Sequence, residues 1–463
     1  MKKKISRLLS LLVLATLTVP TTTSAQSLSD NGIFYHSYTS PWSSSLNPAL
    51  FPQSAKWYIT LPRFSADLSL PFSFKDLNLQ HDPTRDVTVF NATDFANLMV
   101  QRKFRFSTDV GFNLLGVGFS IGPNLHFTLD VGAKAHGLLT LPIEVTRLLT
   151  EGNLNENRHL QLGTALPFSA MAYAYASAGV AYHIPDGALT VGARFNMLAG
   201  YAMASIDHLT LDVTTSADTS SLSLLVDYQG RFSSPYPLFH EINTNENTLF
   251  PDFLPENLGY TFDLGAKFSL FNIDFSASIL DLGPGITWSD YTTVITPPAD
   301  NHPIEFDGFD LNRVNEQGYF NSWLDTLKHK LDFQEIDTTF RYTPPTRIYF
   351  GASFSLLQTL KIGYLFHGEI ESGLFNPVQI QTFRMNNSVS LNVSLFKWFE
   401  LTLANSLAYD GNSFSLFNPG LAISLNPFRR IQFYAAVDYI SNFHLVDMRA
   451  AHIYFGINLY GHR

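Results

Sequence analysis

The chain contains no cysteine, and after residues 1–25 it contains no run of about 18 consecutive apolar residues. The first absence excludes a disulfide framework and a lipid-modified cysteine. The second excludes a transmembrane helix, because a helix needs about 20 such residues to cross the hydrocarbon core. Charge is also scarce, at 15% of residues, whereas aromatic residues reach 14%. Since only helices and closed barrels can span lipid, a membrane protein with this sequence would cross with strands.

Residues 1–25 predict a secretory signal peptide that is removed. Lys2 to Arg7 form a basic region, Leu8 to Val19 form an apolar region, and Ala25 ends a small-residue cleavage site. The apolar region is short for a membrane anchor. Removal takes four basic and no acidic residues from totals of 29 and 39, so the net charge falls from −10 to −14. That charge argues against a nucleic-acid partner.

Apolar and polar residues alternate strictly between Gly259 and Trp288. One face of the first run carries Phe262, Leu264, Ala266, Phe268 and Leu270, and the other carries Thr261, Asp263, Gly265, Lys267 and Ser269. The alternation resumes at Ile273 after Phe271-Asn272. Two such runs with almost no loop between them predict a β-hairpin with one uncharged face.

The same alternation recurs along the chain, and every second connection between the predicted strands is tight. The short connections are 122–124, 185–187, 271–272, 357–359, 396–399 and 426–430, and the four longest are 71–103, 141–167, 214–257 and 289–344. This is the sidedness of outer-membrane barrels, which have short periplasmic turns and long outer loops. A soluble β-sandwich shares the period but has no reason to sort its loops.

The connections also give a strand count. Thirteen of them join fourteen strands, provided that Leu222–Tyr228 forms a small excursion outside the barrel. The sequence therefore predicts an all-β fold, a transmembrane antiparallel up-and-down β-barrel of about 14 strands over residues 56–463. Residues 26–55 form a polar segment before the barrel, either a leader or a hatch inside the lumen. A change of parity at Leu114-Leu115 predicts a β-bulge.

Two short motifs resemble those of a known family. Leu46-Asn47-Pro48-Ala49 resembles the Asn-Pro-Ala segment near the start of long-chain fatty-acid transporter barrels and their PorV-like relatives. Asp281-Leu282-Gly283 with Ile286 and Trp288 is similar to a strand ending in PorV-like barrels, although Pro284-Gly285 interrupts it here.

The resemblance implies fourteen strands with the N-terminal segment inside the lumen. It marks Asn47, Pro48 and Ala49 as hatch residues. From the residues themselves, Asn47 can bond backbone groups locally, and Pro48 favours an extended Asn47. The expected hatch covers residues 40–52. The resemblance assigns no substrate-binding residues.

The polar faces of the predicted strands supply a candidate lumen lining. It comprises Arg105, Asp109, Asp130, Lys134, Arg194, Asp263, Lys267, Asp274 and Asp438. Mixed signs favour a wall whose charges brace one another inside a plugged barrel, because an ion-selective pore usually carries rings of one sign. A selectivity lining is the alternative.

The longest loop contains a predicted helix near residues 320–331. Its apolar stripe consists of Phe320, Trp323, Leu324, Leu327 and Leu331. Such a stripe needs a surface to cover, and the barrel mouth is favoured over a protein partner or the membrane. A second short helix is predicted at Pro142–Leu149.

No catalytic, metal-binding or cofactor-binding set stands out, so we expect neither an enzyme nor a bound cofactor. His126 and His136 share one face of a strand, but ten residues span about 33 Å, too far for one metal ion. Gly283-Pro284-Gly285 is a turn or bulge and not a phosphate cradle, because no helix follows it.

Two functional hypotheses follow for a protein of a Gram-negative outer membrane. The first is a transport barrel for small hydrophobic or amphipathic compounds, with membrane lipid and a hydrophobic small molecule as partners. The second is a PorV-like interaction or shuttle barrel of a secretion or surface-assembly machine, with a protein partner at the outer loops. A general porin is disfavoured, because fourteen strands with a plug leave little open lumen.

Overall fold

The computed structural model describes most of the chain, and every structural statement below concerns those residues. They are 26–27, 32–37, 39–52, 55–77, 80–82, 87–89, 98, 105–140, 159–185, 187–215, 222–233, 256–297, 304–306, 334–357, 359–370, 383–395, 398–409, 414–428, 430–438 and 447–462. The predicted signal peptide and the helices predicted at 142–149 and 320–331 lie outside the described residues. No helix in the described ranges is long and apolar enough to cross a membrane.

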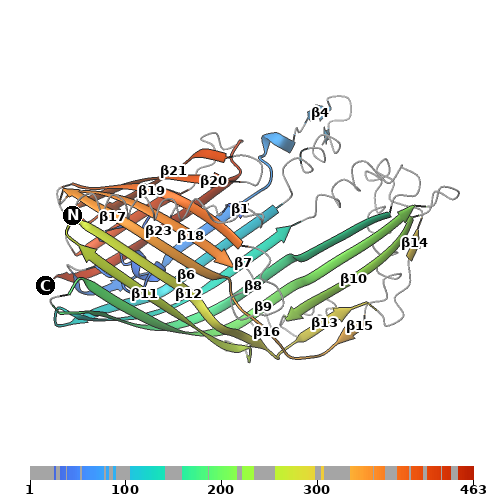
Figure 1. Ribbon diagram of the computed structural model, residues 1–463, viewed down its shortest axis with the longest axis horizontal. Coiled ribbons are helices and arrows are strands. Elements are labelled where there is room, and N and C mark those ends of the chain that lie inside the picture. Colours follow the sequence, from blue (N-terminus) through green and yellow to red (C-terminus); the bar gives the residue numbers. More distant parts are fainter. Residues whose placement is uncertain are drawn as a thin grey trace.

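Fourteen antiparallel strands close into a barrel (Figure 1), which confirms the predicted fold class. The first strand is divided at Pro62 into β2 and β3. The strands are β2 (Ala55–Thr60) with β3 (Arg63–Ser69), β6 (Arg105–Ile121), β7 (Leu125–Thr140), β8 (His159–His183), β9 (Leu189–Thr215), β11 (Leu258–Leu270), β12 (Ile273–Trp288), β17 (Thr346–Leu357), β18 (Leu360–Ile370), β19 (Phe383–Leu395), β20 (Phe399–Tyr409), β21 (Phe414–Leu425), β22 (Ile431–Asp438) and β23 (Ala450–His462). The last strand pairs with both β2 and β3, so the wall has no open edge.

The two faces of the wall differ sharply in exposure. Phe268 and Phe433 point outward and are 43% and 44% exposed, whereas Asp263 and Asp438 point inward and are 3% and 0% exposed. Alternation with a period of two produces this separation, because successive side chains of a strand point to opposite faces. An exposed apolar band around a polar interior is the arrangement that lipid requires.

Two irregularities interrupt the ladder. The predicted bulge appears as a register shift between Asn113 and Leu115 on β6. The second lies on β12, where Asp281 and Gly285 adopt positive φ values of 58° and 71°. There β12 pairs with β17 only as far as Leu280, so residues 281–285 form a break in the wall.

Part of the wall continues beyond the barrel as an outer extension. Strands β8 and β9 have 25 and 27 residues, and in Figure 1 they run past their neighbours toward β10, β13, β14 and β15. The first of these, β10 (Leu222–Ser233), pairs along β9 where β11 has ended, so the expected excursion hairpin is instead one strand of this extension. The shorter strands are β13 (Thr292–Thr296), β14 (Ile304–Phe306), β15 (Gln334–Ile336) and β16 (Phe340–Tyr342).

Two sequence-based boundaries need correction. Residues 289–344 do not form a plain loop, because β13, β14, β15 and β16 lie within them and pair with β10, β13 or β12. Strand β8 begins at His159 and not at Phe168. The remaining small elements are β1 (Gln26–Ser27), which pairs parallel to β19, the 3-10 turn η1 (Lys75–Leu77), and the pair β4 (Gln80–Asp82) and β5 (Val87–Val89).

Candidate functional site

An N-terminal segment, residues 32–37 and 39–52, packs against inward-facing side chains from several strands of the barrel. It contains the helical turn α2 (Trp42–Leu46). Its aromatic rings meet the wall: Trp42 lies 5.0 Å from Tyr454, and Phe51 stacks 4.4 Å from His126, measured between ring centroids. Tyr454 belongs to β23 and His126 to β7, so the segment bridges strands from both ends of the chain.

Asn47 joins this segment to β11 and β12. Its Nδ2 donates to the Tyr35 hydroxyl at 3.1 Å and to the carbonyls of Ala277 at 3.2 Å and Ala266 at 3.4 Å. Its Oδ1 accepts the Ala49 N–H at 2.9 Å. The residue before Pro48 is extended, with φ −153° and ψ 112°, which is the conformation that a following proline favours. The amide is fully buried, so substitution would leave several polar groups without partners.

Two glycines let the backbone of the segment approach the wall. A Cβ atom on Gly192 would lie 2.4 Å from the carbonyl carbon of Pro48. A Cβ atom on Gly265 would lie 2.1 Å from Asn47 Oδ1 and 2.9 Å from Pro48 Cδ. Any larger residue at either position would force the segment away from the wall.

The strands β20, β22 and β23 hold the beginning of the segment. The Glu400 carboxylate accepts hydrogen bonds from Ser37 Oγ at 2.9 Å and Thr39 Oγ1 at 2.5 Å. Gln432 Nε2 donates to Thr39 Oγ1 at 2.9 Å, and the Tyr460 hydroxyl donates to the Thr39 carbonyl at 2.7 Å. These anchors were not predicted from the sequence. Glu400 and Gln432 each come just after a short turn, at a strand position that alternates with apolar residues. That alternation is the only local sign that they face inward.

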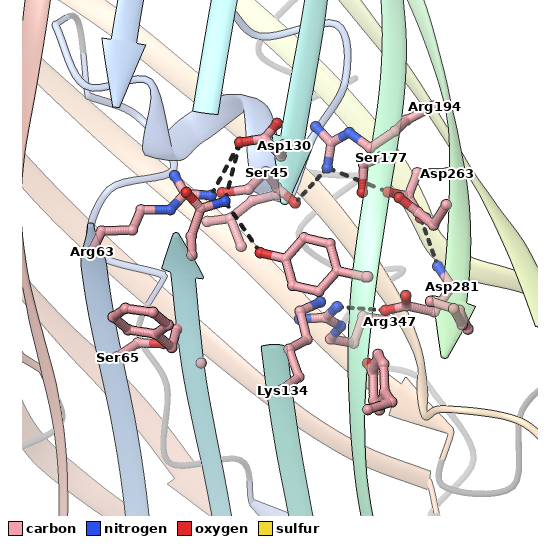
Figure 2. A pocket seen from close by; sticks show the side chains of 18 of the residues that line it. Ser45, Arg63, Ser65, Asp130, Lys134, Ser177, Arg194, Asp263, Asp281 and Arg347 are labelled. Carbon is pink, nitrogen blue, oxygen red and sulfur yellow. Dashed lines mark hydrogen bonds and ion pairs between the residues drawn. The ribbon is translucent and has the colours of Figure 1, made fainter. Parts of the chain in front are cut away.

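A chain of polar contacts links the segment to the break in β12 (Figure 2). Arg194 donates to the carbonyls of Ser44 and Ser45 and pairs with Asp263 at 3.3 Å. Asp263 Oδ1 accepts the backbone N–H of Asp281 at 2.8 Å. The Asp281 carboxylate in turn pairs with Arg347 on β17. This series of contacts crosses the position where β12 and β17 stop pairing. Side-chain contacts therefore replace the backbone hydrogen bonds of the sheet there.

A cavity of about 120 Å³ lies between the segment and this part of the wall. Figure 2 shows the side chains of Arg63, Lys134, Arg194 and Arg347 converging on it from separate strands. Its acidic lining residues are Asp130, Asp263 and Asp281. Four cations thus face three carboxylates.

The predicted lumen residues divide between this cavity and other places. Asp130, Lys134, Arg194 and Asp263 line the cavity. Arg63, Asp281 and Arg347 also line it, and they were not among the predicted lumen residues. Asp281 was singled out only as part of a motif. Arg63 and Arg347 lie at the starts of strands, where the alternation that separates inward from outward residues is weakly defined.

The other predicted residues face inward elsewhere. Asp109 contacts His136 at 2.8 Å, and Lys267 pairs with Asp274 at 3.3 Å. Asp438 accepts the Ile33 N–H at 3.4 Å, and Arg105 is half-buried at one end of β6. The described residues hold no group of three or more His, Asp or Glu that could bind a metal ion.

An apolar cluster lies beside the cavity. Its buried members are Met171, Tyr173, Leu198, Met203, Ile286, Trp288, Val294, Phe340 and Tyr342. Tyr173 and Leu198 belong to both the cluster and the cavity lining. Barrel interiors are usually polar, so an inward-facing apolar cluster of this size is unusual.

Comparison with known proteins gives one family and several barrels of similar shape. A family model described as "Family of unknown function (DUF5723)" matches residues 48–438. No curated protein matches the chain. A FadL homologue from Pseudomonas aeruginosa aligns with a TM-score of 0.43 at 9% identity, covering 95% of this chain and 98% of that one. The Pseudomonas putida toluene transporter TodX gives 0.36 at 10% identity, with 95% and 96% covered. The barrel described above rests on this chain's own strand pairing.

Proposed function

This chain belongs to the DUF5723 family, and from its interior we propose that it carries small hydrophobic or amphipathic compounds across a Gram-negative outer membrane. The observation behind the proposal is the apolar cluster that shares Tyr173 and Leu198 with a charged cavity. An amphipathic molecule has an apolar body and a polar group, and adjoining apolar and charged surfaces match those two parts. Secretion would use the signal peptide predicted at residues 1–25.

The proposal includes a hatch formed by the N-terminal segment. Its contacts with β7, β9, β11, β20 and β23 support a packed plug that prevents open diffusion. The hatch touches the wall most closely at Asn47, Pro48 and Ala49. Gly192 and Gly265 permit this close approach because they lack a Cβ atom. Deletion of residues 40–52 should leave a folded barrel with a higher single-channel conductance in planar bilayers. A folded deletion variant that conducts no more than the intact protein would show that the segment is only a leader.

The transport proposal is tested by uptake into cells of a Gram-negative host that expresses the full-length protein. Toluene and benzyl alcohol serve as labelled probes. Leu198→Asp places a charge in the apolar cluster and should lower uptake at least about tenfold, because an uncompensated charge in an apolar site is strongly unfavourable. Asn392→Asp is the matched control, since Asn392 is an equally buried inward-facing residue on β19. Heat-dependent gel mobility establishes that both variants fold.

The competing PorV-like function is separated by what accompanies the protein from the membrane. Native purification followed by mass spectrometry should recover hydrophobic small molecules with the barrel. Recovery of a stoichiometric protein complex, together with uptake no greater than in cells without the protein, would favour the shuttle function and overturn transport.

A further inference from the structure

The cavity beside the N-terminal segment has an excess of positive charge. Its lining contains Arg63, Lys134, Arg194 and Arg347 against three carboxylates. Each carboxylate is engaged within the wall. Asp263 and Asp281 pair with Arg194 and Arg347, and Asp130 lies 3.8 Å from Arg63 and accepts a hydrogen bond from Asn113.

Lys134 stands apart from the other three cations. Within the described residues it takes part in no ion pair, and its Nζ lies over the ring of Tyr175, 5.3 Å from the centroid. A second donor is also unused: Arg194 is 7% exposed, and its Nε–H has no partner in the described part of the chain. An ammonium group and a buried N–H thus remain available at one cavity.

The size of the cavity limits what it can hold. Its 120 Å³ is slightly below the roughly 150 Å³ of a protein cavity that binds benzene. Unlike that cavity, this one has hydroxyl and amide groups around the charges, including Ser177 and Asn196. A carboxylate or phosphate group fits these limits, whereas a long acyl chain does not.

We propose that this cavity is a binding site for a small oxyanion, a carboxylate or phosphate group, held through Lys134 and Arg194. The oxyanion balances the excess charge and accepts hydrogen bonds from donors that the wall leaves unused. The site lies against α2, so a bound anion also stabilises the packing of the N-terminal segment. The inference does not depend on transport, because a bound anion can be measured in the purified protein.

Isothermal titration of the full-length protein in a neutral detergent tests this proposal. The probes are inorganic phosphate, benzoate and the uncharged benzyl alcohol, at constant ionic strength. Benzoate or phosphate should bind at one site per chain, and benzyl alcohol should bind more weakly than benzoate. Binding of phosphate identifies a free anion as sufficient, whereas binding of benzoate alone identifies the carboxylate of an organic molecule.

Substitutions locate the site. Lys134→Met should weaken anion binding by about tenfold or more, because charge-assisted hydrogen bonds are the strong ones, and Lys134→Arg should retain it. Lys267→Met is the matched control, since that lysine is already paired with Asp274 and does not line the cavity. Equal affinity of Lys134→Met and wild type would overturn the proposal. So would the failure of both anions to bind the wild type, or benzyl alcohol binding as tightly as the tighter-binding anion. Neither of these two outcomes depends on a variant that folds.

Discussion

The two halves of the lumen wall hold the N-terminal segment by different means. Strands β3 to β17 present arginine, lysine and aspartate around a cavity, and their charges mostly pair with one another. Strands β18 to β23 present mainly amides and hydroxyls, together with a buried ion pair between Glu369 and Arg384. Their buried polar residues include Asn386, Ser388, Ser390, Asn392, Thr402, Asn418, Ser424, Gln432 and Asn458. Here the carboxylates of Glu400 and Asp438 accept hydrogen bonds from the segment itself.

This contrast separates two uses of buried polarity. In the charged half, each ion pair offsets the cost of its own desolvation and adds little net stability, but loss of one partner leaves a buried charge. In the amide half, each lost hydrogen bond costs only a moderate amount. The charged half should therefore respond more strongly to single substitutions, although both halves contact the same segment.

The largest expected effect comes from Arg194→Met in the charged half. Asp263 is 3% exposed and would keep a buried charge without its partner, so the free energy of unfolding should fall by about 3–5 kcal/mol. Urea unfolding of the full-length protein in detergent, followed by gel mobility, measures the change. Lys267→Met is the control, because Asp274 retains Lys361 at 3.9 Å and Ser269 at 2.6 Å. Equal stability of the two variants, both in the charged half, would show that an unpaired buried carboxylate does not cause the loss.

A smaller effect is expected from adding a methyl group where the segment touches each half. Gly265→Ala in the charged half forces Asn47 and Pro48 away from the wall and should cost about 1–3 kcal/mol. Gly363→Ala in the other half meets the side chains of His36 and Ser390, whereas Gly265→Ala meets Asn47, Pro48 and the backbone of Ala49, so we expect a smaller displacement of the segment near Ala49.

Thiol labelling reports whether the segment moves in these two variants. The chain has no cysteine, so Ala49→Cys supplies a unique site in each background. Maleimide labelling of this thiol should accelerate with Gly265→Ala more than with Gly363→Ala. Equal rates would mean that both halves contact the segment with equal rigidity.

Glu400→Gln tests the anchor in the amide half. The substitution keeps an acceptor oxygen but removes the charge that strengthens the bonds from Ser37 and Thr39, so about 1 kcal/mol should be lost. Hydrogen exchange measured by mass spectrometry should speed up in residues 32–39 and remain unchanged near Ala49. A change spread over the whole segment would show that the two halves are not independent anchors.

The smallest effect belongs to an ion pair outside the lumen. Lys75 is 72% exposed in its side chain and lies 3.3 Å from Asp447. Lys75→Met should change the free energy of unfolding by less than about 1 kcal/mol, since exposed pairs contribute little. If Lys75→Met lowers the free energy of unfolding as much as Arg194→Met, burial does not explain why the charged half is sensitive to substitution.

The sequence predicts the barrel well because its determinants are local. Alternation assigns an inward Asp263 and an outward Phe268, and the sorted loop lengths give fourteen strands. The bulge near Leu114 is likewise visible as a change of parity. The outer extension was missed because β13, β14, β15 and β16 have only three to five residues each, and because the pairing of β10 along β9 begins only where β11 has ended.

The site is less predictable for a physical reason. Parity tells which side chains enter the lumen but not at what height, because the stagger between strands is a property of the closed barrel. Asp130 and Asp263 therefore meet at one cavity, whereas Asp274, equally polar and inward, does not line it. The contacts of Thr39 with Gln432 and Tyr460 join residues about 400 positions apart, for which a local pattern carries no signal.

The bond between Thr39 and Tyr460, 421 residues apart in the chain, has a consequence for assembly. A closed cylinder offers no lateral entrance for a segment that touches strands on all sides. The segment can therefore enter only through an open end of the cylinder or before β23 meets β3. Contacts of such long range form late and slowly, so seam closure and docking of the segment should be one cooperative step. We therefore expect the last strands to close the barrel and the N-terminal segment to dock at the same stage of folding.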